Sequence, residues 1–519
     1  MTGSLTPSLQ REKASEEQLE DASEYDFGGE SQLPPPPILS EEEERKLWRK
    51  IDLRLMPILC VMYLMSFMDR GNIGIVFTRN ARLQGLETQL NLTGNQYNIA
   101  LTMYFIPYCI FECPANLVLK KFRPSVWLPG ITVLWGIIMT LMGLVKTYPQ
   151  LVGVRVCLGV AEAGLFPGVA YYLSLWYPRN ALQSRIGLFF GAATIAGAFS
   201  GLFAFAISFM SGTRGLLGRS WIFIIEGILT VTVVLVDFPV TASFLTPEER
   251  AFIVRKKKYD NSSVGEEEKF DVKYVYQAFT DWQVWLNSLL FGLAAYRYQV
   301  WIHILIYMSL IGPLYGITLF LPTIISDFGE FSTAISQLLT VPPYIFATLV
   351  LGFFAYYSDK IMMRSPFILA AQILCLIGFS INIANVSSGA KYFGTFLIVA
   401  GSYSGFPGIV AWLGNNLSGQ YKRGVGMALH IGIGNFSGAI ASNIFRTQDK
   451  PRFILGHGIE LMFVGIGMIL LPVTVFVYSR INLKRAKFME RVAEGLEKQP
   501  SVKELRELGD RAPNFRYIL

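Results

Sequence analysis

The sequence predicts an all-α polytopic membrane protein with twelve transmembrane helices, arranged as two pseudo-symmetric six-helix bundles. Of the 519 residues, 52% are hydrophobic and only 16% are charged, whereas soluble domains carry about 25% charged residues. Twelve apolar runs have lengths close to the roughly 20 residues that a membrane span needs. Short motifs of the first six runs recur in the last six. This composition excludes a disordered chain and a disulfide-rich secreted scaffold.

The net charge of +7 does not indicate a nucleic-acid partner. The basic residues lie in short clusters between apolar runs, which is the pattern of a positive-inside topology in a lipid bilayer. The five cysteines lie inside apolar runs and form no CxxC pair. We therefore expect no metal site, no disulfide framework and no cofactor.

Residues 1–50 are predicted to be a disordered acidic tail. They contain the runs Pro34 to Pro37 and Glu41 to Glu44 and too few apolar residues to bury a core. Their polarity also argues against a cleavable signal peptide.

The apolar runs divide the rest of the chain into two halves. Residues 51–240 are predicted to form the N-terminal bundle and residues 300–480 the C-terminal bundle, with a central loop at 241–299 and a C-terminal tail at 481–519. The twelve spans are expected near residues 55–77, 96–119, 126–145, 150–176, 185–210, 220–240, 300–325, 335–357, 366–386, 392–414, 424–445 and 457–479.

The basic clusters predict the orientation of the chain in the membrane. They precede the first span, lie in the central loop and follow the last span, as in Lys484-Arg485. The loops expected on the opposite side carry fewer basic residues. Both termini and the central loop are therefore expected to be cytoplasmic, with the plasma membrane as the expected location.

Two motifs recur at nearly the same offset. Phe166-Pro-Gly in span 4 returns as Phe406-Pro-Gly in span 10, and Phe199-Ser-Gly in span 5 returns as Phe436-Ser-Gly in span 11. A basic loop near Lys120 also has a counterpart near Lys360. Many secondary transporters consist of two such homologous halves, with the substrate site between them at mid-membrane.

Ionisable residues inside spans are costly, so they are candidates for function by default. Asp69 and Arg70 lie in span 1, about 21 Å along the helix from Leu55. The alternative is that this helix ends at residue 68 and leaves both side chains solvated.

Arg155 and Glu162 form the second candidate pair, in span 4. Their spacing of seven residues places them on one helix face about 10 Å apart, which is too far for a salt bridge but suits a shared cavity. The alternative is that Arg155 extends toward the membrane surface and Glu162 is a packing residue.

Other polar side chains in the spans carry weaker signals. Tyr104 and Tyr108 share a helix face and could line a cavity, although most aromatic residues in membrane helices only pack. Asp359, with Lys120 in the equivalent loop, is expected to help close the cytoplasmic gate. Structural roles are favoured for the remaining buried candidates, which are Glu112, Glu226 and His430.

Several stretches resemble one family, the fungal anion:cation symporter group of the major facilitator superfamily, which includes allantoate, pantothenate and nicotinate permeases. The resemblance runs from about residue 45 to the end of the chain. No GxxxxGK[ST] nucleotide-binding loop is present. The matching stretches are Asp69-Arg-Gly-Asn-Ile-Gly74, Asn80-Ala-Arg-Leu-Gln-Gly-Leu86, Leu119-Lys-Lys-Phe-Arg-Pro-Ser125, Leu158-Gly-Val-Ala-Glu-Ala-Gly-Leu-Phe-Pro-Gly168, Trp221-Ile-Phe-Ile-Ile-Glu-Gly227, Leu339-Thr-Val-Pro-Pro-Tyr344 and Gly509-Asp-Arg-Ala-Pro-Asn-Phe-Arg-Tyr517.

The resemblance implies the major facilitator fold and proton-coupled symport of a small organic anion by alternating access. The implied substrates are carboxylates such as nicotinate, pantothenate, allantoate or tartrate, with protons as co-substrate and a monomer as the working unit. It implies proton coupling at Asp69 and Glu162 and anion binding at Arg70 and Arg155. A facilitator without proton coupling and a non-transporting nutrient receptor remain alternatives, whereas no nucleophile–base pair suggests an enzyme.

The chain departs from the family pattern at two places. Residues 75–79 separate Gly74 from Asn80, where the family usually continues directly. The segment Asp281-Trp-Gln-Val-Trp is echoed 16 residues later by Tyr298-Gln-Val-Trp. We therefore hypothesise that residues 284–299 derive from a retained intron or from an error in the gene model.

Overall fold

The computed structural model describes most of the two predicted bundles. Three segments that carry predictions lie outside the described part of the chain: residues 1–36 of the predicted tail, residues 76–79 and residues 284–298. The hypotheses about these segments therefore stay predictions. The described ranges are 39–75, 96–121, 124–178, 181–208, 218–231, 244–258, 299–329, 333–418, 420–446, 452–501, 504–505 and 508–519, with a few isolated positions.

Each predicted span overlaps a described helix or a pair of consecutive helices. A backbone in lipid must satisfy its own polar groups, which makes the helix the expected form of every apolar run. The N-terminal half contains α2 (Glu41–Ile75), α5 (Gln96–Lys121), α6 (Pro124–Met142), α7 (Tyr148–Glu162) followed by α8 (Leu165–Trp176), α9 (Leu182–Ser208) and α10 (Gly218–Val231). The C-terminal half contains α13 (Gln299–Gly329), α14 (Thr333–Leu338) followed by α15 (Val341–Ile361), α16 (Ser365–Ile383), α17 (Ser388–Asn416), α18 (Gln420–Gly434) followed by α19 (Phe436–Ile444), and α20 (Ile454–Ala493).

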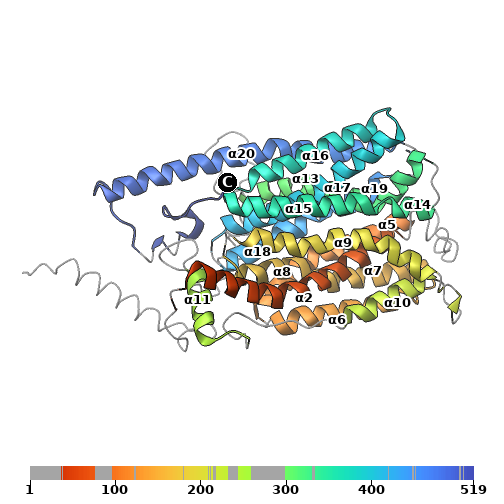
Figure 1. Ribbon diagram of the computed structural model, residues 1–519, viewed down its shortest axis with the longest axis horizontal. Coiled ribbons are helices and arrows are strands. Elements are labelled where there is room, and N and C mark those ends of the chain that lie inside the picture. Colours follow the sequence, from red (N-terminus) through yellow and green to blue (C-terminus); the bar gives the residue numbers. More distant parts are fainter. Residues whose placement is uncertain are drawn as a thin grey trace, which may run out of the picture.

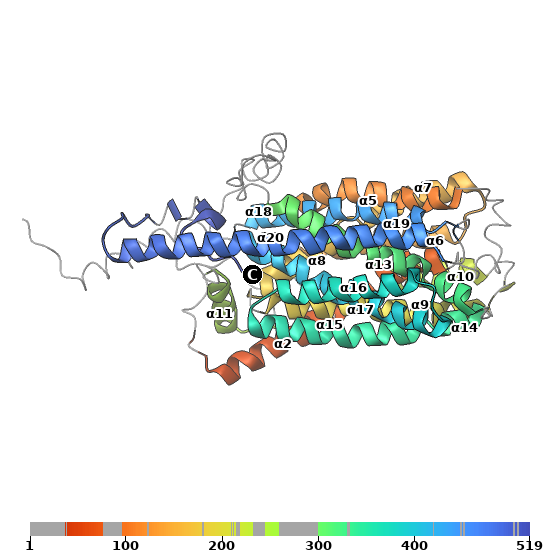
Figure 2. The same ribbon diagram turned by 90° about the horizontal axis from the view of Figure 1, so that it is seen from above.

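The helices of the two halves run side by side along the long axis of the molecule (Figure 1). Among the described residues, eight helical segments are long and apolar enough to cross a membrane, and three shorter apolar helices accompany them. The short helix α11 (Pro247–Lys258) and the last turns of α20 lie at the same end of the bundle, as both views show (Figures 1 and 2). We call this the α11 end; it corresponds to the side predicted to be cytoplasmic.

The first helix begins inside the predicted disordered tail, at Glu41. Ser40 and Glu43 explain this start, because they form a capping box. The Ser40 backbone N–H donates to Glu43 Oε2 at 2.9 Å, and the Glu43 N–H donates to Ser40 Oγ at 3.4 Å. The prediction that all of residues 1–50 are disordered was therefore wrong for residues 41–50.

Helix α11 packs against this first part of α2 through two ion pairs. Lys50 Nζ lies 2.8 Å from Glu249 Oε2, and Lys256 pairs with Glu44. Partial burial raises the pKa of Glu249, but the hydrogen bonds from Lys50 and Thr246 outweigh it and hold this pKa below its usual range. The central loop is thus tied to the N-terminal half at the α11 end.

The predicted C-terminal tail is also ordered in large part. Helix α20 extends to Ala493, and residues 509–519, which we call the C-terminal strap, return to the α11 end of the C-terminal half. Trp412 Nε1 and Asn416 Nδ2 donate to the Ile518 carbonyl at 2.8 and 2.9 Å. Tyr517 stacks on Tyr478 of α20 with ring centroids 4.5 Å apart.

Two cations hold the other part of the C-terminal strap. Lys422 Nζ lies 2.7 Å from Asp510 Oδ1. Arg485 donates to the backbone carbonyls of Phe515 and Asp510 at 3.0 and 2.7 Å. The strap therefore ties α17, α18 and α20 together at the α11 end.

Candidate functional site

An aromatic pocket lies where the two halves meet. Its walls come from α2, α5, α8 and α9 of one half and from α13, α17 and the α18–α19 junction of the other. The lining residues are Tyr63, Phe67, Tyr108, Phe166, Phe190, Tyr307, Ile311, Leu314, Tyr315, Phe406 and Asn435.

The internal repeat meets across this pocket. Phe166 and Phe406 occupy matching positions of the two halves, and their ring centroids lie 5.3 Å apart. Asn435 contributes an amide to the lining, and its Oδ1 accepts hydrogen bonds from Tyr307 and Tyr315 at 3.2 and 3.3 Å. The cavity volume is only about 10 Å³, which is close to the minimum for one water molecule. The halves must therefore separate before the pocket can admit an organic molecule.

Glu162 lies next to the pocket and is held by two hydroxyl groups. Tyr104 of α5 donates to Glu162 Oε2 at 2.6 Å, and Ser66 of α2 donates to Glu162 Oε1. The Glu162 side chain is 0% exposed. Tyr104 in turn contacts the pocket residue Tyr108, with ring centroids 5.6 Å apart. A buried acid is thus connected to the pocket wall through a tyrosine.

Arg155 contacts the ring of the same tyrosine. It is buried, and its guanidinium carbon lies 5.2 Å from the centre of the Tyr104 ring, within the range of a cation–π contact. The alternative in which Arg155 extends away from the core was therefore wrong. Arg155 and Glu162 are both buried, and both contact Tyr104.

The local sequence explains why these groups meet. Gly159 lies between Arg155 and Glu162 on α7, and a Cβ at this position would collide with the Tyr104 carbonyl oxygen. Glycine thus lets α5 and α7 approach closely enough for Tyr104 to reach both charged side chains. The chain then turns at Ala163–Gly164, so that Glu162 ends α7 and Phe166 lies at the start of α8.

Asp69 lies one turn beyond Ser66 on the same helix. It is 0% exposed, and Trp135 Nε1 of α6 donates to its Oδ2 at 2.6 Å. Helix α2 continues to Ile75, so the alternative in which it ends at residue 68 was wrong. The side chain of Arg70 lies outside the described part of the structure.

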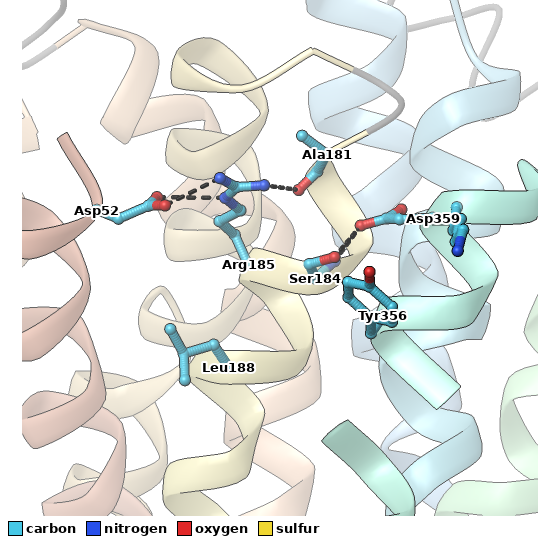
Figure 3. Close-up of a pocket in the computed structure, with 8 residues that line it drawn as sticks. Asp52, Ala181, Ser184, Arg185, Leu188, Tyr356 and Asp359 are labelled. Atoms are coloured by element: carbon cyan, nitrogen blue, oxygen red, sulfur yellow. Dashed lines mark hydrogen bonds and ion pairs between the residues drawn. The ribbon is translucent and has the colours of Figure 1, made fainter. Parts of the chain in front are cut away.

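Asp359 joins the two halves at the α11 end. It accepts a 2.6 Å hydrogen bond from the Ser184 backbone N–H, near the N-terminus of α9, and a second bond from the Ser184 hydroxyl (Figure 3). Arg364 Nη1 lies 2.6 Å from Asp359 Oδ1. A carboxylate at a helix N-terminus is favoured by the free N–H groups and the helix dipole.

An ion pair and an open groove lie beside the contact between Asp359 and Ser184. Arg185 binds Asp52 through two hydrogen bonds of 2.9 and 3.2 Å, and both residues line an open groove of about 550 Å³ beside Asp359 (Figure 3). The side chain of Lys120, the other residue expected at the gate, lies outside the described part.

The opposite end of the pocket is closed as well. Asn443 Nδ2 of α19 donates to Thr102 Oγ1 of α5 at 2.9 Å, and the rings of Phe105 and Tyr315 lie 5.0 Å apart. Hydrogen bonds and aromatic contacts between the halves thus lie on both sides of the pocket.

Of the other buried candidates, His430 borders the pocket through the lining residue Tyr307. His430 packs against Tyr307 at a centroid distance of 4.8 Å, and its Nε2 lies 2.9 Å from the His303 carbonyl oxygen. Glu112 and Glu226 are fully buried in α5 and α10. Three buried polar residues were not predicted from the sequence, namely Ser66, Trp135 and Glu460, because hydroxyl and indole groups in spans are common and Glu460 lies near a helix end.

Two helical halves that close on a shared pocket, with buried charges beside it, define a secondary transporter of small molecules. The sequence also matches the profile of the Major Facilitator Superfamily over residues 59–442. The chain therefore belongs to the Major Facilitator Superfamily, and it is a multi-pass membrane protein.

Known proteins agree with this membership. The chain is 33% identical to the MFS-type transporter cnsO of Penicillium expansum, with 92% of this chain and 90% of the relative covered. It is 31% identical to the high-affinity nicotinic acid transporter of Saccharomyces cerevisiae, with 92% and 85% covered. The solved structure of the proton:xylose symporter XylE bound to 6-bromo-6-deoxy-D-glucose is similar in fold, with a TM-score of 0.56, 14% identity, and 80% and 94% covered.

Proposed function

We propose that the chain is a proton-coupled symporter that takes up a small organic anion by alternating access. The observation that carries this proposal is the arrangement around Tyr104, which donates to the Glu162 carboxyl and packs its ring against the Arg155 guanidinium. An anion site and a proton site that share one side chain can influence each other's occupancy.

The coupling follows from electrostatics. A guanidinium near a carboxyl favours the ionised form of that carboxyl. When a substrate carboxylate binds Arg155, it screens this positive charge, and Glu162 then accepts a proton more readily. A coupling of about 3 kcal/mol corresponds to an affinity change of about 150-fold, which is ample for a transporter. Because the anion and the proton enter together, the loaded site keeps the net charge of the empty site.

The pocket lining supports a flat aromatic carboxylate as substrate. Tyr63, Phe166, Phe190 and Phe406 place four rings on a narrow cavity, and aromatic rings pack well on one another. A relative that covers most of the chain is named a nicotinic acid transporter. We therefore place nicotinate-like acids ahead of pantothenate, allantoate and tartrate.

The remaining assignments belong to the same proposal. Arg70 would complete the anion site, and Asp69 would be the second proton acceptor. Asp359 and Lys120 would close the cytoplasmic gate. The α11 end would be cytoplasmic and would carry both termini, with a monomer in the plasma membrane as the working unit.

Labelled nicotinate uptake into proteoliposomes that contain the purified full chain tests the proposal. We expect an inward proton gradient to drive accumulation and a protonophore to abolish it. Uptake that equilibrates without responding to the gradient would identify an uncoupled facilitator. Nicotinate binding without uptake would identify a receptor.

A further inference from the structure

A buried acid in the C-terminal half is not used by the mechanism above. Glu460 is 0% exposed, and neither of its carboxyl oxygens has a hydrogen-bond partner among the described residues. It lies six residues after Ile454, where α20 begins, which is about 9 Å from the end of the helix opposite the α11 end. Burial of an isolated carboxylate costs far more than burial of the neutral acid, so an acid at this position needs an explanation.

Helix α13 forms a seat for this carboxyl group. A Cβ at Gly316 would collide with Glu460 Oε1, and a Cβ at Gly312 would lie 3.2 Å from Oε2. Phe445 and Phe463 are also among the nearest groups. The two glycines are spaced by one helical turn, so together they let the acid lie directly against the α13 backbone.

The same segment of α13 forms the wall of the central pocket. Ile311, Leu314 and Tyr315 line the pocket, and Gly312 and Gly316 contact Glu460. The segment also contains Pro313, which cannot donate a hydrogen bond within the helix and therefore weakens it locally. A change at Glu460 would consequently reach the pocket through a few residues of one deformable helix.

Few titratable groups face this site. Cys375 of α16 faces Glu460. His457 lies one turn earlier on α20, is 1% exposed and has no hydrogen-bond partner for its Nδ1 in the described part. Lys391, at the start of α17, faces His457. Gly312 and Gly316 of α13 and Phe445 after α19 contribute no ionisable group.

We propose that Glu460 is a second proton-binding site, which is loaded from the end opposite α11 and acts on the central pocket through residues 311–316. A proton from water binds the carboxylate, and the neutral acid settles against Gly312 and Gly316. When the halves separate and water reaches the site, the same O–H bond breaks and the proton returns to water. This role rests on the proposed proton coupling and adds a site that lies apart from Glu162.

Infrared difference spectroscopy of the purified full chain at two pH values tests proton binding without any substrate. We expect a carboxylic-acid C=O band in the wild type that is lost in Glu460→Gln. The matched control is Glu226→Gln, which changes another fully buried glutamate and should keep the band. A spectrum of Glu460→Gln identical to that of the wild type would overturn the proposal.

Nicotinate accumulation in proteoliposomes tests the contribution to transport. One co-transported proton multiplies the accumulation ratio by about ten for each pH unit of gradient. We expect Glu460→Gln to lower this ratio about tenfold at a gradient of one pH unit, and an unchanged ratio in the folded variant would refute the role. If the wild type does not respond to the gradient, the proposed coupling fails, and the infrared band alone decides whether Glu460 binds a proton.

A compensating pair covers the case in which Glu460→Gln does not fold. In the double variant Gly316→Ala/Glu460→Ala, the new methyl group of residue 316 occupies space that the carboxyl group leaves. We expect this variant to fold and to lose the infrared band, whereas Gly316→Ala alone should be less stable than the double variant, because its Cβ must displace the Glu460 carboxyl group. Equal stability of the single and double variants would refute the proposed seat.

Discussion

The hydroxyl group of Tyr104 donates a 2.6 Å hydrogen bond to Glu162, while the ring of the same tyrosine lies against Arg155. The two charged residues are on one helix, yet their connection passes through a neighbouring helix. The proposed coupling between anion and proton therefore depends on the contact between α5 and α7. Variants that remove one partner at a time should separate binding from coupling.

Replacing Glu162 with glutamine should uncouple transport. Glutamine resembles the protonated acid in shape and charge but cannot release a proton. We expect nicotinate counterflow to persist in proteoliposomes, whereas accumulation driven by a pH gradient is lost. Retained gradient-driven accumulation would move the proton role to Asp69, and Asp69→Asn would then be the variant to measure.

Removing only the Tyr104 hydroxyl should weaken the coupling and preserve the anion site. Tyr104→Phe keeps the ring against Arg155 but cannot donate to Glu162. We expect a changed pH profile of uptake with an unchanged KM for nicotinate at the optimum. Tyr108→Phe is the matched control, because it changes a neighbouring pocket tyrosine. If Tyr104→Phe and Tyr108→Phe showed the same pH profile of uptake, the role of the Tyr104 hydroxyl in coupling would be contradicted.

Arg155 should determine substrate affinity. A hydrogen bond to a charged group contributes about 1.5–3 kcal/mol, so Arg155→Ala should raise the KM for nicotinate about 10- to 100-fold. Arg155→Lys should also bind poorly if the carboxylate uses both arms of the guanidinium. Transport with a normal KM in both variants would remove Arg155 from the anion site.

The Asp359–Arg364 pair should stabilise the C-terminal half at the α11 end, because it links α15 to the start of α16. Arg364 is 0% exposed, so Asp359→Asn leaves a buried charge without its partner. Breaking such a pair costs about 3–5 kcal/mol, and replacing both members with apolar residues is often neutral. We expect a lower Tm for Asp359→Asn and recovery in Asp359→Leu/Arg364→Met. The absence of any recovery in the double variant would show that the pair itself is not the cause.

The C-terminal strap should detach when Tyr517 is truncated. Tyr517→Ala loses the stack on Tyr478 and the contact with Arg485, whose guanidinium carbon lies 4.7 Å from the centre of the Tyr517 ring. Faster tryptic cleavage at Arg511 is the expected result. Leu496→Ala changes a side chain that is 71% exposed and serves as the control. Equal cleavage of both variants would show that Tyr517 does not hold the strap.

The contact of α11 with α2 should weaken in acid. The pKa of Glu249 is lowered in the folded protein. Its interaction with Lys50 therefore contributes fully above the unfolded-state value of about 4.3 and is lost as the pH falls through the folded-state pKa. The protection factors of the α11 amides, which are exchange rates corrected for the intrinsic effect of pH, should therefore fall in this acidic range. Glu249→Gln should show no such dependence, and a parallel loss of protection in that variant would point to another group.

The membrane class, the positions of the spans and the repeat could be predicted from the sequence. These features follow from local composition, because an apolar run of sufficient length must form a helix in lipid. The burial of Asp69, Arg155 and Glu162 was predictable for a related reason, since ionisable residues persist in spans only where the interior of the bundle accommodates them.

Which buried side chains form hydrogen bonds with each other could not be predicted from hydropathy. Glu162 binds Ser66 and Tyr104, whereas Asp69 binds Trp135. These contacts depend on how α2, α5, α6 and α7 are rotated about their axes and on how closely the helices approach one another. Tertiary packing also makes residues 509–519 an ordered strap, because their backbone groups find donors and acceptors on α17 and α20. The sequence by itself determined which segments are apolar enough to cross the membrane and that Asp69, Arg155 and Glu162 are buried, since hydropathy is a local property. Only the tertiary structure decided which side chains meet, because that depends on distances between helices that are far apart in the chain.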